Sequence, residues 1–149
     1  MSEEQITKAL LKWLETENWE LVCFDFPQSG TGRILHLNNS ENHKNKGAII
    51  PDIVVVRNEV ALFFENKDRF YHPDFQKVDR LRNSDHYSNS IQSLLETYNV
   101  KKTYFGIGGP KERKFEEKAV EYTDMVDFIV MTDGKRCETI YDPFNSFVP

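Results

Sequence analysis

The stretch that decides the fold is IIPDIVVVRNEVALFFENK, residues 49–67. It holds two apolar runs, IVVV and ALFF, which are separated by a short segment that begins with the polar sequence RNE. Runs of β-branched and aromatic residues on either side of a short polar turn are typical of a β-hairpin. The sequence therefore predicts paired strands over residues 49–56 and 60–67.

Charged side chains bracket the two apolar runs. Asp52 stands near the start of the first strand, and Glu65 and Lys67 stand at the end of the second. In a hairpin the start of one strand lies beside the end of the other. Because side chains alternate across a strand, Glu65 and Lys67 should share one face and Asn66 should lie on the other. We therefore expect two carboxylates and an ammonium to meet at one edge of the sheet.

Helices and further strands are predicted on both sides of this hairpin. Upstream, Ser2 and Gln5 form a capping box for a helix over residues 3–16, and WELVCFDF predicts a strand over 19–26. Downstream the pattern predicts, in order, a helical region over 74–98 with a break near 83–85, a strand over 103–107 that ends in the turn 108–110, a helix over 111–122, and strands over 127–131 and 137–141. This order indicates an α/β fold with a mixed central β-sheet flanked by helices, in a single domain over residues 1–149.

The composition excludes several classes of protein. The chain has 149 residues, of which 39% are hydrophobic and 13% aromatic, and such a chain can bury a core rather than stay disordered. No apolar run approaches the ~20 residues that span a bilayer, and the acidic N-terminus does not resemble a signal peptide. Cys23 and Cys137 make no metal-binding or disulfide pattern. We therefore expect a reduced, cytoplasmic protein without a membrane partner.

The formal net charge of -5 argues at first against a nucleic-acid partner. The acids, however, are concentrated in two terminal segments, 1–26 and 121–149, each of which has six acidic and two basic residues. Residues 27–120 carry a net charge of +3 and contain the charged residues of the hairpin. A locally basic surface is therefore available in the part of the chain that holds these residues.

The residue types at the hairpin edge suit metal-dependent phosphate chemistry. Two carboxylates such as Asp52 and Glu65 can bind Mg²⁺, a hard cation that prefers oxygen ligands and keeps several waters. Bound Mg²⁺ lowers the pKa of a water and neutralises charge that develops on a phosphate. The Lys67 ammonium can stabilise that charge, whereas neighbouring carboxylates make it a poor general base. The alternative interpretation is structural: Glu65 and Lys67 form an ion pair at a strand end, and Asp52 is a turn residue.

Pro51-Asp52, twelve intervening residues and then Glu65-Asn66-Lys67 resemble the signature of the PD-(D/E)XK nuclease superfamily, which includes restriction endonucleases and Holliday-junction resolvases. The resemblance implies a restriction-endonuclease-like core. It also implies that Asp52 and Glu65 are catalytic metal ligands and that Lys67 is the catalytic lysine. The backbone carbonyl of Asn66 would be a further metal ligand.

The order of predicted elements over residues 3–107 is also similar to the core of that superfamily. Many members add an acidic metal-site residue from the first helix. Here the matching position falls near Thr7, and Glu4, one turn earlier on the same side, is the candidate accessory acid. The alternative is that Glu3 and Glu4 only favour the helix N-terminus, where acids are common.

The resemblance implies a Mg²⁺-dependent DNA endonuclease, with Mn²⁺ as a substitute cofactor. A chain this short has little room for a separate recognition domain, so cleavage of double-stranded DNA suggests a homodimer or a heteromer with a sequence-recognition subunit. The first expectation is a type II restriction enzyme or its small catalytic subunit. A Holliday-junction resolvase-like nuclease is one alternative, and a non-catalytic DNA-binding or regulatory module that keeps the nuclease fold is another.

Basic residues outside the motif are candidate DNA contacts. Lys44 and Lys46 lie in the polar segment that leads into the hairpin, Arg33 precedes that segment, and Arg69 follows the motif. Lys and Arg at such positions can contact phosphates or base edges. The same four residues are equally compatible with ordinary solvated surface.

Overall fold

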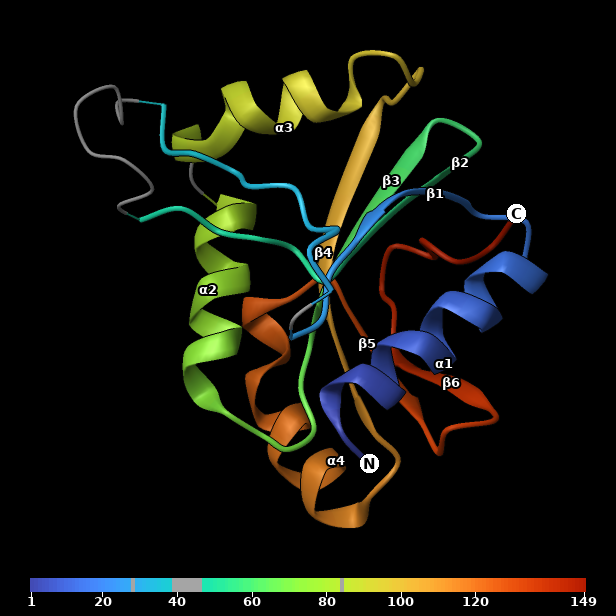
Figure 1. Ribbon diagram of the computed structural model, residues 1–149. Coiled ribbons are helices and arrows are strands. Elements are labelled where there is room, and N and C mark those ends of the chain that lie inside the picture. The colour runs from blue at the N-terminus through green and yellow to red at the C-terminus, as the bar shows by residue number, and fades with distance from the viewer. Residues whose placement is uncertain (28, 39–46, 84) are drawn as a thin grey trace.

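The structure is a computed structural model that describes residues 1–27, 29–38, 47–83 and 85–149. Its centre is a six-stranded mixed sheet in which the strands lie side by side in chain order (Figure 1). The strands are β1 (Glu20–Phe24), β2 (Ile53–Arg57), β3 (Val60–Asn66), β4 (Lys102–Pro110), β5 (Phe128–Thr132) and β6 (Cys137–Tyr141). The helices are α1 (Glu3–Thr16), α2 (His72–Asn83), α3 (Ser88–Leu95) and α4 (Arg113–Ala119), with short 3₁₀ segments η1 (Asp85–Tyr87) and η2 (Val120–Met125). This arrangement confirms the predicted α/β fold with a mixed sheet flanked by helices.

The direction of the strands changes across the sheet. β1, β2 and β3 pair in antiparallel fashion, β3, β4 and β5 are parallel, and β6 returns antiparallel to β5. Parallel neighbours need a crossover connection, which is usually helical. Here α2 and α3 connect β3 to β4, and α4 with η2 connects β4 to β5. The three helices after the hairpin therefore follow from the parallel half of the sheet.

Helices cover both faces of the sheet, with α1 on one side and α2 and α4 on the other (Figure 1). On the α1 side, Ile6 and Leu10 pack with the inward residues of β2 and β3. On the α2 side, Phe75 and Val78 pack with the residues of β2 and β3 whose side chains point to the other face of the sheet. Because both faces of β2 are buried, its residues form a continuous apolar run rather than an alternating pattern.

The central hairpin is formed as predicted, with a turn of two residues rather than the predicted 57–59. Ile53 pairs with Phe64, and Arg57 pairs with Val60 across the turn. The two turn residues, Asn58 and Glu59, both have positive φ angles, of 49° and 70°. Two positive φ angles are typical of a type I′ turn, whose twist matches that of the strands it joins.

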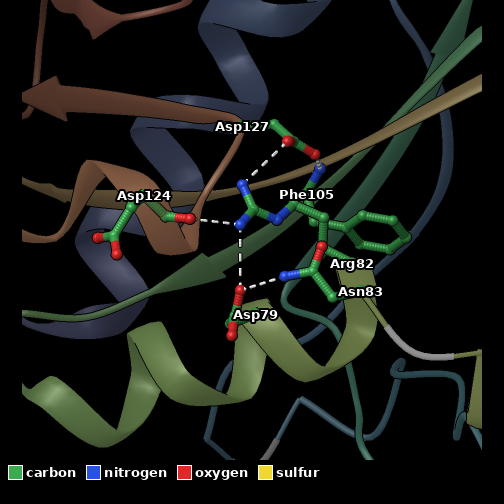
Figure 2. A network of polar contacts seen from close by, with 6 residues as sticks. All are labelled: Asp79, Arg82, Asn83, Phe105, Asp124 and Asp127. Carbon is green, nitrogen blue, oxygen red and sulfur yellow. Dashed lines mark hydrogen bonds and ion pairs between the residues drawn. The ribbon is translucent and has the colours of Figure 1, made fainter.

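Arg82 of α2 ties this helix to the start of β5 (Figure 2). Its guanidinium donates to Oδ1 of Asp79 at 3.0 Å and to Oδ1 of Asp127 at 3.3 Å, and also to the backbone carbonyl of Asp124. The other carboxylate oxygen of Asp127 accepts the amide of Phe105 in β4 at 2.9 Å. The network thus holds α2 against β4 and β5.

The first strand of the hairpin is shorter than predicted. β2 begins at Ile53 rather than at Ile49, because Pro51 has no N–H to donate to a strand ladder. Ile49 instead pairs with Leu35 in an isolated bridge. Asp52 therefore lies immediately before the strand.

The strand predicted over 103–107 is longer than expected and runs through Gly108 and Gly109 to Pro110. The turn predicted there is wrong, because these glycines allow close packing within a strand. A Cβ atom on Gly108 would lie 2.3 Å from Oδ1 of Asn66. A Cβ atom on Gly109 would lie 2.2 Å from the ring of Phe115.

The predicted helices need smaller corrections. α1 has the predicted bounds, and its capping box between Ser2 and Gln5 is formed. The region predicted over 74–98 is α2 and α3 joined by η1, and the break expected near 83–85 falls between α2 and η1, where residue 84 lies outside the described residues. The helix predicted over 111–122 is α4 followed by η2. Among the described residues, no helix has the length and apolar character needed to cross a membrane.

Candidate active site

Asp52 and Glu65 lie close together at the end of the hairpin. Ile53 pairs with Phe64, and the amide of Asp52 also donates to the carbonyl of Phe64 at 3.0 Å, so the regular register ends at Ile53. The charges of Glu65 and of Lys77 in α2 both act on the Asp52 carboxyl group. The structure therefore brings the two predicted metal ligands together near α2.

Asn66 contacts Asp52 through its backbone and α1 through its side chain. Its amide donates to Oδ2 of Asp52 at 2.6 Å, which fixes that carboxylate. The residue is 1% exposed, and its side chain donates from Nδ2 to Oγ1 of Thr7 in α1 at 3.1 Å. Asn66 thus faces α1 and Glu65 faces α2, as predicted, whereas Lys67, which was predicted to share the face of Glu65, pairs with Glu3 of α1.

Lys67 follows β3 and turns toward the N-terminus of α1. Its amide donates to the carbonyl of Gly108 at 3.0 Å, and its Nζ atom lies 3.0 Å from Oε1 of Glu3. The acid that α1 brings to Lys67 is therefore Glu3, whereas Glu4 was the predicted accessory acid of the metal site. Glu4 is exposed and pairs with Lys8 on the same helix at 3.4 Å, because residues four apart share a helix face.

Two residues of α2 that the motif does not include complete the cluster. Nζ of Lys77 lies 2.9 Å from Oε1 of Glu65, whose side chain is only 9% exposed. Asp74, one helical turn before Lys77, is buried. We call the six residues Glu3, Asp52, Glu65, Lys67, Asp74 and Lys77 the charged cluster.

The carboxyl groups of the charged cluster are hard to ionise together. Burial raises the pKa of Asp52 to about 8, and the charge of Glu65 adds to this rise, while a backbone hydrogen bond and the Lys77 ammonium oppose it. Burial also raises the pKa of Glu65 against the opposing charge of Lys77. It raises the pKa of Asp74 against the charge of Lys67. An additional cation near these groups would stabilise their ionised forms.

The surroundings of Lys67 favour its protonated, charged form. Burial alone would lower the pKa of Lys67, but the hydrogen bond to Glu3 and the charges of Asp74 and Glu65 outweigh burial, so the pKa is raised. A lysine of this kind is charged at neutral pH. It can therefore stabilise a negative charge, as predicted, and is a poor proton acceptor.

The donor set fits a hard divalent cation. Asp52 and Glu65 offer carboxylate oxygens, and the Asn66 carbonyl shares a strand edge with the amide that contacts Asp52. Oδ2 of Asp74 is buried and accepts no hydrogen bond from the described residues, so the charged cluster is short of positive partners. Within the described part of the chain, no group of three or more His, Cys, Asp or Glu side chains is placed to hold a metal ion. A cation would therefore rely on two carboxylates, a carbonyl and water, a set that Mg²⁺ accepts.

Two of the predicted DNA-contacting residues, Arg33 and Arg69, are described by the structure and are not part of the charged cluster. Arg33 and Arg69 are both exposed, and Arg69 lies two residues after Lys67, close to the cluster in the chain. Lys44 and Lys46 fall on residues outside those that the structure describes.

Glu3, Asp74 and Lys77 were not among the predicted site residues. Asp74 and Lys77 stand three apart in the helix that follows the motif, and such spacing places them on one helix face. That signal was available in the sequence. The position of Glu3 depends on how α1 crosses the sheet, which no local pattern reveals.

Comparisons of the chain with protein-family models, with curated proteins and with solved structures give no match.

Proposed function

We propose that this chain is a Mg²⁺-dependent DNA endonuclease that hydrolyses phosphodiester bonds. The observation that carries the proposal is the proximity of Asp52 and Glu65 at the end of the hairpin, where the charge of Glu65 acts on Asp52, with the Lys67 ammonium within electrostatic reach of Glu65. The order α1, β1, hairpin, α2 and β4, with β4 parallel to β3, agrees with the nuclease core that the sequence resembles.

The ion pairs of the site favour this proposal over the purely structural interpretation. That interpretation requires Glu65 and Lys67 to neutralise each other at the strand end. Instead, Glu65 pairs with Lys77 and Lys67 pairs with Glu3. Burying these charges is costly, and a cation-dependent reaction gives a reason for keeping them.

Each residue of the motif has a role in the proposed reaction. Asp52 and Glu65 would hold Mg²⁺, with the carbonyl of Asn66 as a third protein ligand. The bound ion would supply an activated water and offset negative charge on the scissile phosphate. The amide of Asn66 keeps the Asp52 carboxylate in place through its 2.6 Å hydrogen bond. The Lys67 ammonium stabilises the charge that builds up on the phosphate.

Incubation of the protein with supercoiled plasmid, with and without Mg²⁺, tests the proposal. The wild type should nick or linearise the plasmid only with Mg²⁺ or Mn²⁺, and Asp52→Ala should not. Lys67→Ala should still bind DNA but lose cleavage, and Glu4→Ala, in the exposed pair with Lys8, is the matched control. Cleavage by Asp52→Ala at the wild-type rate would refute the proposed site.

The same assay separates the kinds of nuclease. Discrete fragments from long DNA support a type II restriction enzyme or its catalytic subunit, acting as a homodimer or with a recognition subunit. Cutting confined to four-way junctions supports a resolvase. Metal-independent, tight DNA binding without cleavage would support a non-catalytic module instead.

A further inference from the structure

Lys77 occupies the place in the charged cluster where a cation is most needed. Its Nζ atom lies 2.9 Å from Oε1 of Glu65, and its charge also acts on Asp52 and Asp74. The lysine comes from α2, outside the motif, and its charge acts on both proposed metal ligands. The charge of one ammonium thus favours the ionised form of three buried or half-buried carboxyl groups.

The exposure of the two partners shows which of them can move. The Glu65 side chain is 9% exposed and stands on a central strand, whereas the Lys77 side chain is 27% exposed and has a long flexible stem. A lysine stem can lie along the protein while its ammonium reaches water. The ion pair can therefore open by movement of Lys77 alone, without any change in the sheet.

We propose that Lys77 is a resident counter-ion of the site, and that a divalent cation must displace its ammonium from Glu65 in order to bind. This inference rests on the proposed function, since it concerns the same carboxylates. Without metal, Lys77 neutralises Glu65 and keeps the site folded. With metal, the Glu65 oxygen is transferred from the ammonium to the cation, and Lys77 is released toward solvent. The site would therefore bind the metal only at concentrations at which the cation can displace the ammonium.

Calorimetric titration of Mn²⁺ into metal-free protein, at mildly alkaline pH where protons compete least, tests this competition. Removing a unit positive charge a few Å from the cation should tighten Mn²⁺ binding by about tenfold in Lys77→Met. Lys77→Gln, which keeps a hydrogen-bond donor but no charge, should change in the same direction. Lys8→Met is the control, because its pair with Glu4 is exposed, and it should bind Mn²⁺ like the wild type.

Thermal unfolding gives a second measurement on the same proteins. Lys77→Met should unfold at a lower temperature than the wild type in EDTA, because Glu65 loses its partner. Mn²⁺ should then raise its unfolding temperature by more than it raises that of the wild type. Unchanged or weaker Mn²⁺ binding by both Lys77 variants would overturn the inference.

Amine labelling of the wild type tests the inference without any variant of Lys77. Acetylation of Lys77, followed by mass spectrometry, should increase several-fold when Mn²⁺ is added, whereas acetylation of the exposed Lys8 should not. In Asp52→Asn, Mn²⁺ should leave labelling of Lys77 unchanged. Constant labelling of Lys77 in wild type saturated with Mn²⁺ would show that the ammonium is not displaced.

The two proposals fail in different ways. If the wild type binds no Mn²⁺, or binds it equally well without Asp52, the proposed nuclease site is refuted. If Mn²⁺ binding depends on Asp52 but is indifferent to Lys77, only the counter-ion role is refuted.

Discussion

Oε1 of Glu3 and Nζ of Lys67 lie 3.0 Å apart, so the first turn of α1 contacts the ammonium that follows β3. The charge of Glu3 also acts on Asp52. Its sequence neighbour Glu4 is directed to solvent, where it pairs with Lys8. Two adjacent acids of one helix turn therefore differ in their relation to the site.

Glu3→Gln should weaken metal binding, whereas Glu4→Gln should not. Removing one negative charge from the charged cluster should raise the Mn²⁺ dissociation constant by about threefold to tenfold. The loss of unfolding free energy should stay below about 1 kcal/mol, because both partners of the Glu3–Lys67 pair are partly exposed. Titration calorimetry and urea unfolding measure the two effects. A larger effect of Glu4→Gln on metal binding would restore Glu4 as the accessory acid.

Asp52→Asn should stabilise the metal-free protein at neutral and mildly alkaline pH. Burial raises the pKa of Asp52 from 3.8 to about 8, so between these values the folded chain keeps a proton that the unfolded chain has lost. The stability that this group contributes therefore falls as the pH rises through that range. The variant should gain on the order of 2 kcal/mol near the upper end of the range. Urea unfolding in EDTA at several pH values measures this, and parallel pH profiles for the two proteins would contradict it.

Gly108→Ala should damage both stability and the site. The added Cβ atom would lie 2.3 Å from Oδ1 of Asn66 and 2.5 Å from Cδ1 of Leu10, and overpacking of this kind costs about 1–3 kcal/mol. Because Asn66 also holds the Asp52 carboxylate, Mn²⁺ binding should weaken.

Gly106→Ala is the control for this effect. Gly106 pairs with Phe64, beside the charged cluster, but its Cβ atom would lie against the ring of Phe128, at 2.4 Å, rather than against Asn66. It should lose a similar amount of unfolding free energy in urea but keep its Mn²⁺ affinity at temperatures where it is folded. Equal loss of affinity in both variants would mean that the site responds to general destabilisation.

Arg82→Met should be among the most destabilising single changes outside the core. Arg82 bridges α2 to Asp127, whose side chain is only 8% exposed, and the substitution leaves that carboxylate without its cation (Figure 2). We expect a loss of about 3 kcal/mol in urea unfolding. Arg82→Lys should restore little, because an ammonium lacks the planar fork of donors. Arg113→Met, at a residue 90% exposed, should change the unfolding free energy by less than about 0.5 kcal/mol.

Local patterns predicted most of the fold because they depend on neighbouring residues. The capping box defined α1, and the two apolar runs defined the hairpin and thereby the meeting of Asp52 with Glu65. The extension of β4 could not be predicted in the same way. Glycine is ordinarily a turn signal, and the packing that requires Gly108 and Gly109 becomes visible only with Asn66 and Phe115 in place.

The side chains that form ion pairs with the motif residues could not be predicted either. Lys77 reaches Glu65 because the crossover from β3 to β4 returns α2 over the face on which Glu65 lies. Glu3 reaches Lys67 because α1 lies on the opposite face with its first turn at the same end. Both contacts depend on tertiary arrangement rather than on spacing in the chain.

The parallel pairing of β3 with β4 has a consequence for the order of folding. This pairing closes the chain between Lys67 and Lys102, and closing long loops costs chain entropy before the contacts form. The hairpin, with its two-residue turn, is local and can form early. The charged cluster needs α1 and α2 as well, so metal affinity should be acquired late in refolding. An isolated peptide of residues 49–67 would carry the whole motif and still lack Glu3, Asp74 and Lys77.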